Sequence, residues 1–152
     1  MPTISSMKAI GWVDPNSKTF AARNIIVISS AGIKVSCNKE LAKIFKHFLA
    51  ELDVLTKGDL DKTRDDWGYA NRNVRGSTSK SFHAWGLALD VNATINPMGP
   101  RATKFPEAAT RALAHKYGLR WGLDYSGPRK DAMHFEFIGS LAAARHIAST
   151  LS

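Results

Sequence analysis

The sequence predicts a single domain in which helices are mixed with short β-strands. Its 152 residues are enough to enclose one hydrophobic core. Some segments repeat apolar residues every three or four positions, as an amphipathic helix does, whereas others alternate or are rich in β-branched residues, as strands are. No internal repeat or convincing linker separates these segments, so we expect one domain over residues 1–152.

The first part of the chain predicts a hairpin followed by a helix. Residues 1–18 are polar and rich in turn formers, and we expect an irregular lead-in there. The β-branched segment 20–29 and the alternating segment 33–36 are joined by a short turn, a pattern that predicts a β-hairpin. Asn38 can cap a helix that begins at Lys39. The apolar stripe of this helix consists of Leu41, Ile44, Phe45, Phe48, Leu49 and Leu52.

The second part predicts shorter elements around a long loop. Pro106 can open a helix that runs to about residue 117, where Gly118 ends it. Residues 92–106 are punctuated by prolines, and such a loop is often functional, here as one wall of a substrate groove. The acidic segment 58–68 lacks the ligand pattern of a calcium loop, so we interpret it as a solvated turn. The other expected elements are strands over 67–74, 119–123 and 134–138, a turn over 124–130 and a helix over 141–151.

The charge of the chain favours an anionic partner. The formal net charge is +8, and the sequence pI is about 9.8, which suits nucleic acid, anionic lipid or an anionic cell-wall polymer. Cys37 is the only cysteine, so no intrachain disulfide can form and the fold can mature in a reducing cytosol. Residues 1–18 carry no secretory pattern, and no apolar run is long enough to cross a bilayer. We therefore expect a protein made in the host cytoplasm that another agent must release.

A histidine and an aspartate on either side of a glycine suggest half of a metal site. His83 and Asp90 would lie about 23 Å apart in an extended chain, too far to share one ion. Gly86 permits a reversal between them, because glycine adopts backbone conformations that other residues resist. In the alternating run that follows, the leucines would face a core and Asp90 the opposite side of a strand.

His134 completes the set of candidate ligands. Two imidazoles and a carboxylate suit zinc, with a fourth position left to water in a catalytic site. Asp131 stands three residues before His134, near enough to act as the base for the water that zinc activates. Glu136 shares the strand face of His134, either orienting that ligand or forming a surface ion pair.

Serine chemistry is the obvious rival. Serines precede His83 closely, but the Gly-x-Ser-x-Gly turn of a serine hydrolase is missing from the sequence. A phosphate-binding glycine-rich loop is missing as well.

The combined motifs resemble a known family. They comprise Arg72-Asn-Val-Arg-Gly-Ser77, Ser81-x-His83-x-x-Gly86-x-Ala88-x-Asp90-x-Asn92, Asn96-Pro97, Trp121-Gly122 and Asp131-x-Met133-His134-Phe135-Glu136. This set resembles the VanY-like D-alanyl-D-alanine carboxypeptidases, a family of zinc peptidases that includes phage L-alanyl-D-glutamate endolysins and is grouped with lysostaphin and the hedgehog signalling domain. The resemblance covers core motifs over residues 67–138.

The resemblance implies an α+β fold whose small antiparallel sheet carries zinc and is flanked by helices. By motif position, the zinc ligands are His83, Asp90 and His134, and the catalytic acid/base is Asp131. The site arginine of the family falls on Arg72, with Arg75 as the alternative. These assignments agree with the chemistry of the residues, because an arginine can stabilise oxyanion charge or hold a substrate carboxylate.

We therefore expect a monomeric zinc peptidase acting on bacterial peptidoglycan, most simply an L-alanyl-D-glutamate endopeptidase of the phage endolysin type. The alternative within the family is a D-alanyl-D-alanine carboxypeptidase. A metal-dependent nuclease is the alternative from another class, with Arg72, Arg75 and Lys80 gripping phosphates. The sequence shows no further acidic metal site to support a nuclease, and this alternative leaves the motif at residues 133–136 unexplained. An inactive wall-binding protein is a third reading. Our expectation includes neither nucleic acid as a partner nor insertion into a membrane.

Overall fold

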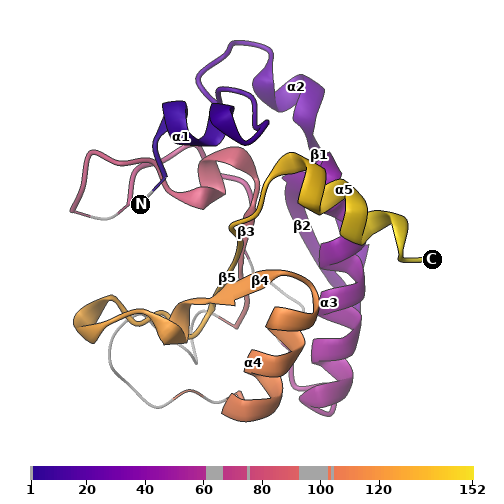
Figure 1. Cartoon of the computed structure of the whole chain (residues 1–152). Helices are drawn as coiled ribbons and strands as arrows, with labels where there is room; N and C mark the ends of the chain where they lie inside the picture. Colours follow the sequence, from indigo (N-terminus) through magenta and orange to yellow (C-terminus); the bar gives the residue numbers. More distant parts are fainter. Residues whose placement is uncertain (1, 61–66, 75, 93–102, 104) are drawn as a thin grey trace.

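The protein has an α+β fold with two small antiparallel sheets and helices around them (Figure 1). A computed structural model describes residues 2–60, 67–74, 76–92, 103 and 105–152. The acidic residues 61–66, the alternative site arginine Arg75, and residues 93–102 and 104 of the proline-rich loop lie outside the described residues. Our interpretations of those positions stay predictions.

The start of the chain is more helical than predicted. Helix α1 spans Ile4–Ala9, which corrects the expectation of an irregular lead-in. Thr3 and Ser6 form a reciprocal capping box, and Met7 is buried beneath the helix. A second correction concerns Phe20–Asn24, which forms helix α2 instead of the first part of a strand. Its alanines and arginine favour a helix, whereas the β-branched residues begin only at position 25.

The predicted hairpin and the helix after it are both present. Strands β1 (Ile25–Ser30) and β2 (Ile33–Asn38) pair in antiparallel fashion around a tight turn. The side chain of Asn38 then caps a short 3₁₀ turn, Lys39–Leu41, which leads into α3 (Ala42–Leu55). The entire predicted apolar stripe of this helix is buried, so α3 forms the centre of the core.

A three-stranded sheet carries different chemistry on its two faces. Strand β5 (His134–Phe137) lies between β3 (Ala88–Asp90) and β4 (Leu119–Trp121), with antiparallel pairing on both sides. One face presents apolar side chains, including Leu89, Phe135 and Trp121, and the ring of Phe135 packs 4.8 Å from that of Phe48 in α3. Since side chains alternate along a strand, the polar residues of β3, β4 and β5 share the other face.

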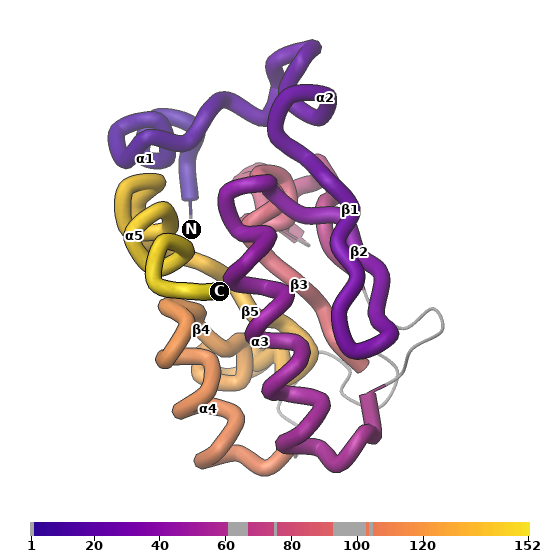
Figure 2. Tube along the Cα trace, turned by 90° about the vertical axis from the view of Figure 1, so that its right-hand side faces the viewer, coloured from indigo at the N-terminus to yellow at the C-terminus, as the bar shows by residue number. Residues whose placement is uncertain are grey.

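Helices complete the core on the apolar side. Helix α4 (Glu107–Lys116) starts after Pro106 and ends before Gly118, as the sequence predicted, and it runs beside α3 in both views (Figures 1 and 2). The turn between β4 and β5 contains two 3₁₀ segments, Gly122–Asp124 and Gly127–Arg129. The chain closes with α5 (Leu141–Ser149), capped by the side chain of Ser140.

Residues 67–74 do not form the strand that the sequence predicted. Their backbone hydrogen bonds go to several separate parts of the chain: among them, Trp67 pairs with Asp90, Tyr69 donates to Ser36, and Ala70 donates to His83. Only isolated bridges result, because the segment crosses from one sheet to the other without following either. It nevertheless connects the hairpin to the strand that carries Asp90.

A search of the described residues for membrane-spanning helices found none with the necessary length and apolar character.

Candidate metal centre

A left-handed glycine turn positions His83 beside the sheet. His83 lies in the 3₁₀ segment Phe82–Trp85, which the side chain of Ser81 caps. Gly86 ends that segment at φ +72°, and a Cβ atom there would approach the backbone nitrogen of Asn38 to 2.5 Å. Glycine is thus required both for the conformation and for the close contact with the hairpin. The chain then turns directly into β3, so the predicted reversal is present.

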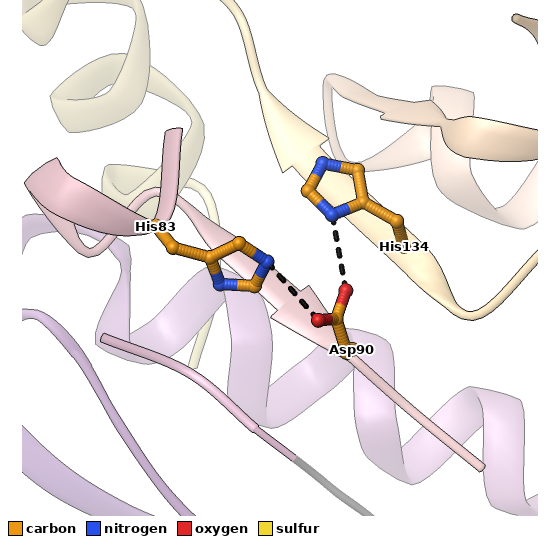
Figure 3. Close-up of side chains that lie close together, drawn as sticks. All are labelled: His83, Asp90 and His134. Atoms are coloured by element: carbon orange, nitrogen blue, oxygen red, sulfur yellow. Dashed lines mark hydrogen bonds and ion pairs between the residues drawn. The ribbon is translucent and has the colours of Figure 1, made fainter. Parts of the chain in front are cut away.

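Strand register brings the second and third candidate ligands together. Asp90 on β3 is the direct partner of His134 on β5, and both side chains lie on the polar face of the sheet. His134 Nδ1 lies 3.0 Å from Asp90 Oδ1, and His83 Nε2 lies 3.2 Å from Asp90 Oδ2 (Figure 3). The carboxylate therefore stands between two imidazole rings that come from different parts of the chain.

The hydrogen-bond partners of the two histidines leave one nitrogen of each ring available to a metal. His83 Nδ1 lies 2.7 Å from the carbonyl oxygen of Gly68, so Nδ1 carries the proton that it donates there. His83 Nε2 is buried and has no hydrogen-bond partner among the described residues. On His134 the order is reversed: Nε2 lies 2.6 Å from Glu136 Oε1, which leaves Nδ1 for the ligand role. One nitrogen from each ring thus points at the carboxylate.

The three side chains fit a metal ion. The candidate ligand atoms of His83, Asp90 and His134 all lie within 4.8 Å of one another, and all three residues are buried. An unpartnered imidazole nitrogen facing a carboxylate oxygen is unfavourable in a buried site, and a cation between them would satisfy both. This donor set of two imidazoles and one carboxylate is typical of a metal with catalytic chemistry and an open position.

The electrostatics of the metal-free site are dominated by the carboxylate between the rings. Burial alone would raise the pKa of Asp90, but the hydrogen bond with His134, the close contact with His83 and the charges of the two rings hold that pKa well below its ordinary value. Burial would likewise lower the pKa of His134, yet the hydrogen bonds to Asp90 and Glu136 raise it to about 10. The negative charge that keeps His134 protonated in the metal-free site also favours the binding of a cation there.

Asp131 lies next to this cluster as a second, differently tuned carboxyl group. It is 7% exposed, and its Oδ1 has no hydrogen-bond partner among the described residues. Burial is the main cause that raises its pKa to about 6, while the nearby His134 lowers it and Asp90 raises it. A carboxylate with a free oxygen and a pKa close to neutrality is suited to accept a proton and return it.

An open groove leads to the candidate ligands. It has a volume of about 500 Å³ and is lined by the β1–β2 hairpin, by residues 67–70 and by Arg72, His83 and Asp90. The side chain of Arg72 is half exposed, and its Nη2 lies 4.0 Å from Asp90 Oδ2. Arg72 thus lines the groove beside the candidate ligands, and its assignment as the site arginine stays a prediction.

Comparison with known proteins identifies the segment that carries this site. The sequence profile described as D-alanyl-D-alanine carboxypeptidase matches residues 75–137. That segment includes all three candidate ligands and Asp131. The match makes this segment of the chain similar to that family. Together with the buried His-Asp-His set, it supports a metallopeptidase. The curated proteins and the solved structures gave no significant match.

The sequence analysis did not single out two residues that contact the centre through Glu136. Arg120 and Tyr125 both donate hydrogen bonds to the carboxylate of the buried residue Glu136. Both contacts considered for Glu136 are therefore present: an ion pair with Arg120, whose side chain is half exposed, and a contact with the candidate ligand His134. The signal for Arg120 lay in strand register, since Arg120 is the direct partner of Glu136, and register is not readable before the strands are paired.

Proposed function

We propose that the protein is a zinc-dependent peptidase that cleaves the peptides of bacterial peptidoglycan. The single observation that carries the proposal is the buried cluster of His83, Asp90 and His134 inside a segment that matches a peptidoglycan carboxypeptidase family. Zinc is favoured over other metals because two neutral imidazoles and one carboxylate are a common catalytic zinc set. We further propose that the chain forms one domain over residues 1–152.

The side chains around the centre divide the chemistry among them. Zinc, when bound, would act as a Lewis acid toward the scissile carbonyl and lower the pKa of a water molecule. Asp131 then takes the proton of the attacking water, and later delivers it to the departing amine. Arg72 stabilises the negative charge that develops on the carbonyl oxygen, or holds a carboxylate of the substrate. These steps require no covalent intermediate with the protein.

The groove supports an acidic peptide as the substrate. Two cationic side chains, Lys34 and Arg72, line it, and its walls also include the half-exposed ring of Trp67. Stem peptides of peptidoglycan carry free carboxylates on an otherwise small and partly apolar chain. A groove with two cations and an aromatic wall fits such a ligand better than it fits a duplex nucleic acid, which needs a broad basic surface.

Within this class we propose an L-alanyl-D-glutamate endopeptidase that acts as a phage-type endolysin. The protein would be made in the host cytoplasm and act on the wall after release through a membrane lesion, which is compatible with a single cysteine and the +8 charge. That charge would hold a small enzyme on an anionic wall. Lysis should therefore weaken as the salt concentration rises, because dissolved ions screen the attraction between exposed charges, with a Debye length of about 10 Å at 0.1 M.

Products of digestion separate the candidate functions. Purified cell wall is incubated with the zinc-loaded protein, and the new termini are identified by mass spectrometry. New N-terminal D-glutamate supports the endopeptidase, whereas free D-alanine would make the protein a D-alanyl-D-alanine carboxypeptidase. Cleavage of DNA without wall digestion would support the nuclease alternative. Binding to the wall with no new termini would indicate an inactive wall-binding protein.

A further inference from the structure

Three polar side chains beneath the metal centre have no part in the proposed chemistry. Glu136 lies on the same face of β5 as His134, two residues further along the strand. Arg120 on β4 is its cross-strand partner, and Tyr125 reaches it from the turn between β4 and β5. We call Arg120, Tyr125 and Glu136 the histidine anchor.

Every oxygen of the Glu136 carboxylate has a defined partner. Oε1 accepts hydrogen bonds from His134 Nε2 at 2.6 Å and from the hydroxyl group of Tyr125. Oε2 accepts from Arg120, whose Nε lies 2.8 Å away and whose Nη2 also donates to it. The guanidinium group lies over the ring of Tyr125, 5.3 Å from its centroid, which holds both donors against the carboxylate. The carboxylate therefore cannot turn without losing several hydrogen bonds.

We propose that the histidine anchor is a positioning device for the metal ligand His134. Glu136 accepts the proton of Nε2 and so fixes the tautomer in which Nδ1 faces Asp90, while Arg120 and Tyr125 fix Glu136. The inference rests on the metal site of the proposed function, but not on the substrate or the bond cleaved. A ring held in this way loses little freedom when an ion binds, and its charged partner makes Nδ1 a stronger donor.

A purely structural ion pair would not need to be buried or to contact a candidate metal ligand. The chain contains such a pair in Glu51, which accepts hydrogen bonds from Tyr117 and Lys116. This second trio has the same chemistry of carboxylate, phenol and cation, but the side chain of Glu51 is 41% exposed and it bonds to no histidine among the described residues. The Glu136 side chain is 2% exposed and is bonded directly to a candidate ligand. The Glu51 trio is therefore a matched control.

The test measures zinc affinity in the absence of any substrate. Metal-free protein competes with a chromogenic chelator for Zn²⁺, and the variants Glu136→Gln and Tyr125→Phe are compared with Glu51→Gln and Tyr117→Phe. We expect Glu136→Gln to weaken zinc binding by about 10- to 100-fold, the usual effect of removing a carboxylate partner of a ligating histidine. Tyr125→Phe should weaken it less, and both control variants should bind zinc as the wild type does.

A spectroscopic measurement separates positioning from general stability. In ¹⁵N-histidine-labelled protein with zinc bound, His134 should show a proton on Nε2 with a sharp resonance, and Tyr125→Phe should broaden or shift that resonance while Tyr117→Phe leaves it unchanged. Should Glu136→Gln fail to fold, Tyr125→Phe still decides the matter, because it removes one hydroxyl group and leaves the charge. Wild-type zinc affinity and an unchanged His134 resonance in Tyr125→Phe would overturn the proposal.

The two proposals can fail separately. Zinc binding that depends on the histidine anchor, in a protein that releases no new termini from cell wall, would contradict the proposed function and leave the anchor intact. If the wild type digests cell wall and the Glu136→Gln and Tyr125→Phe variants bind zinc as tightly as it does, the histidine anchor is contradicted and the proposed function is supported.

Discussion

Replacing Asp131 by asparagine should remove turnover while the metal and the fold remain. The side chain is buried, its Oδ1 has no hydrogen-bond partner among the described residues, and burial raises its pKa to about 6. In the metal-free protein about nine tenths of such a group is ionised at pH 7 and able to accept a proton. Asparagine keeps the shape but cannot accept that proton, so kcat should fall by about 100-fold or more.

The same carboxyl group gives a stability prediction with a definite sign. A folded-state pKa raised from 3.8 to about 6 means that ionised Asp131 opposes folding by about 3 kcal/mol in the metal-free protein above pH 6. This cost develops as the pH rises from about 4 to 6 and is absent in more acidic solution. Asp131→Asn removes the charge, so at pH 7 the metal-free variant should be at least as stable as the wild type, with any gain reduced by the buried amide.

The assay compares Asp131→Asn with Asp124→Asn, an aspartate on the same turn that pairs with Arg111 outside the metal centre. Zinc content, the free energy of unfolding in urea and the rate of wall-peptide cleavage are measured for both. Full zinc and a native fold with a large loss of rate in Asp131→Asn alone would fit the assignment. Wild-type turnover in Asp131→Asn would refute it and leave the base to be sought elsewhere.

Three further predictions concern the metal and the turn that builds its site. His134→Ala should lose most of the bound zinc and nearly all activity, whereas His115→Ala on helix α4 should keep both; full zinc in His134→Ala by elemental analysis would exclude His134 as a ligand. The hydrogen bonds of His134 raise its pKa to about 10, so zinc binding at pH 7 should release about one proton and should strengthen as the pH rises. Calorimetry in two buffers with different ionisation enthalpies measures the proton release, and zinc binding without it would contradict this prediction. Gly86→Ala should destabilise the fold by more than the roughly 1–2 kcal/mol that a left-handed conformation costs, because the added Cβ also meets the backbone of Asn38. Gly58→Ala measures the conformational cost alone, since its Cβ would meet nothing within 4 Å, and equal losses in the two variants would refute the contact argument.

The sequence predicted those parts of the fold that depend on local patterns. The β1–β2 hairpin, the apolar stripe of α3 and the ends of α4 follow from alternation, helical spacing, proline and glycine, and the structure contains each of them. The errors lie where local signals were weak or overridden. The capping box around Thr3 uses serine in place of glutamate, and residues 67–74 distribute their hydrogen bonds between two sheets.

The sequence predicted that the three candidate ligands lie close together, but it did not predict the residues that orient them. His83, Asp90 and His134 lie in motifs with recognisable spacing, and Gly86 between the first two predicts the turn. The contact between Arg120 and Glu136 depends on the pairing of β4 with β5, which sequence spacing alone does not determine. The same holds for the carbonyl of Gly68, which orients His83 from a segment that the sequence suggested was a strand.

Incubating purified peptidoglycan with zinc-loaded wild type, with Asp131→Asn and with metal-free wild type tests the central claim most directly. The products are separated and their new termini are identified by mass spectrometry. A metallopeptidase built on His83, Asp90 and His134 should release new peptide termini only in the zinc-loaded wild type, with N-terminal D-glutamate among them. Equal release by the metal-free protein, or no release by the zinc-loaded wild type, would contradict the account.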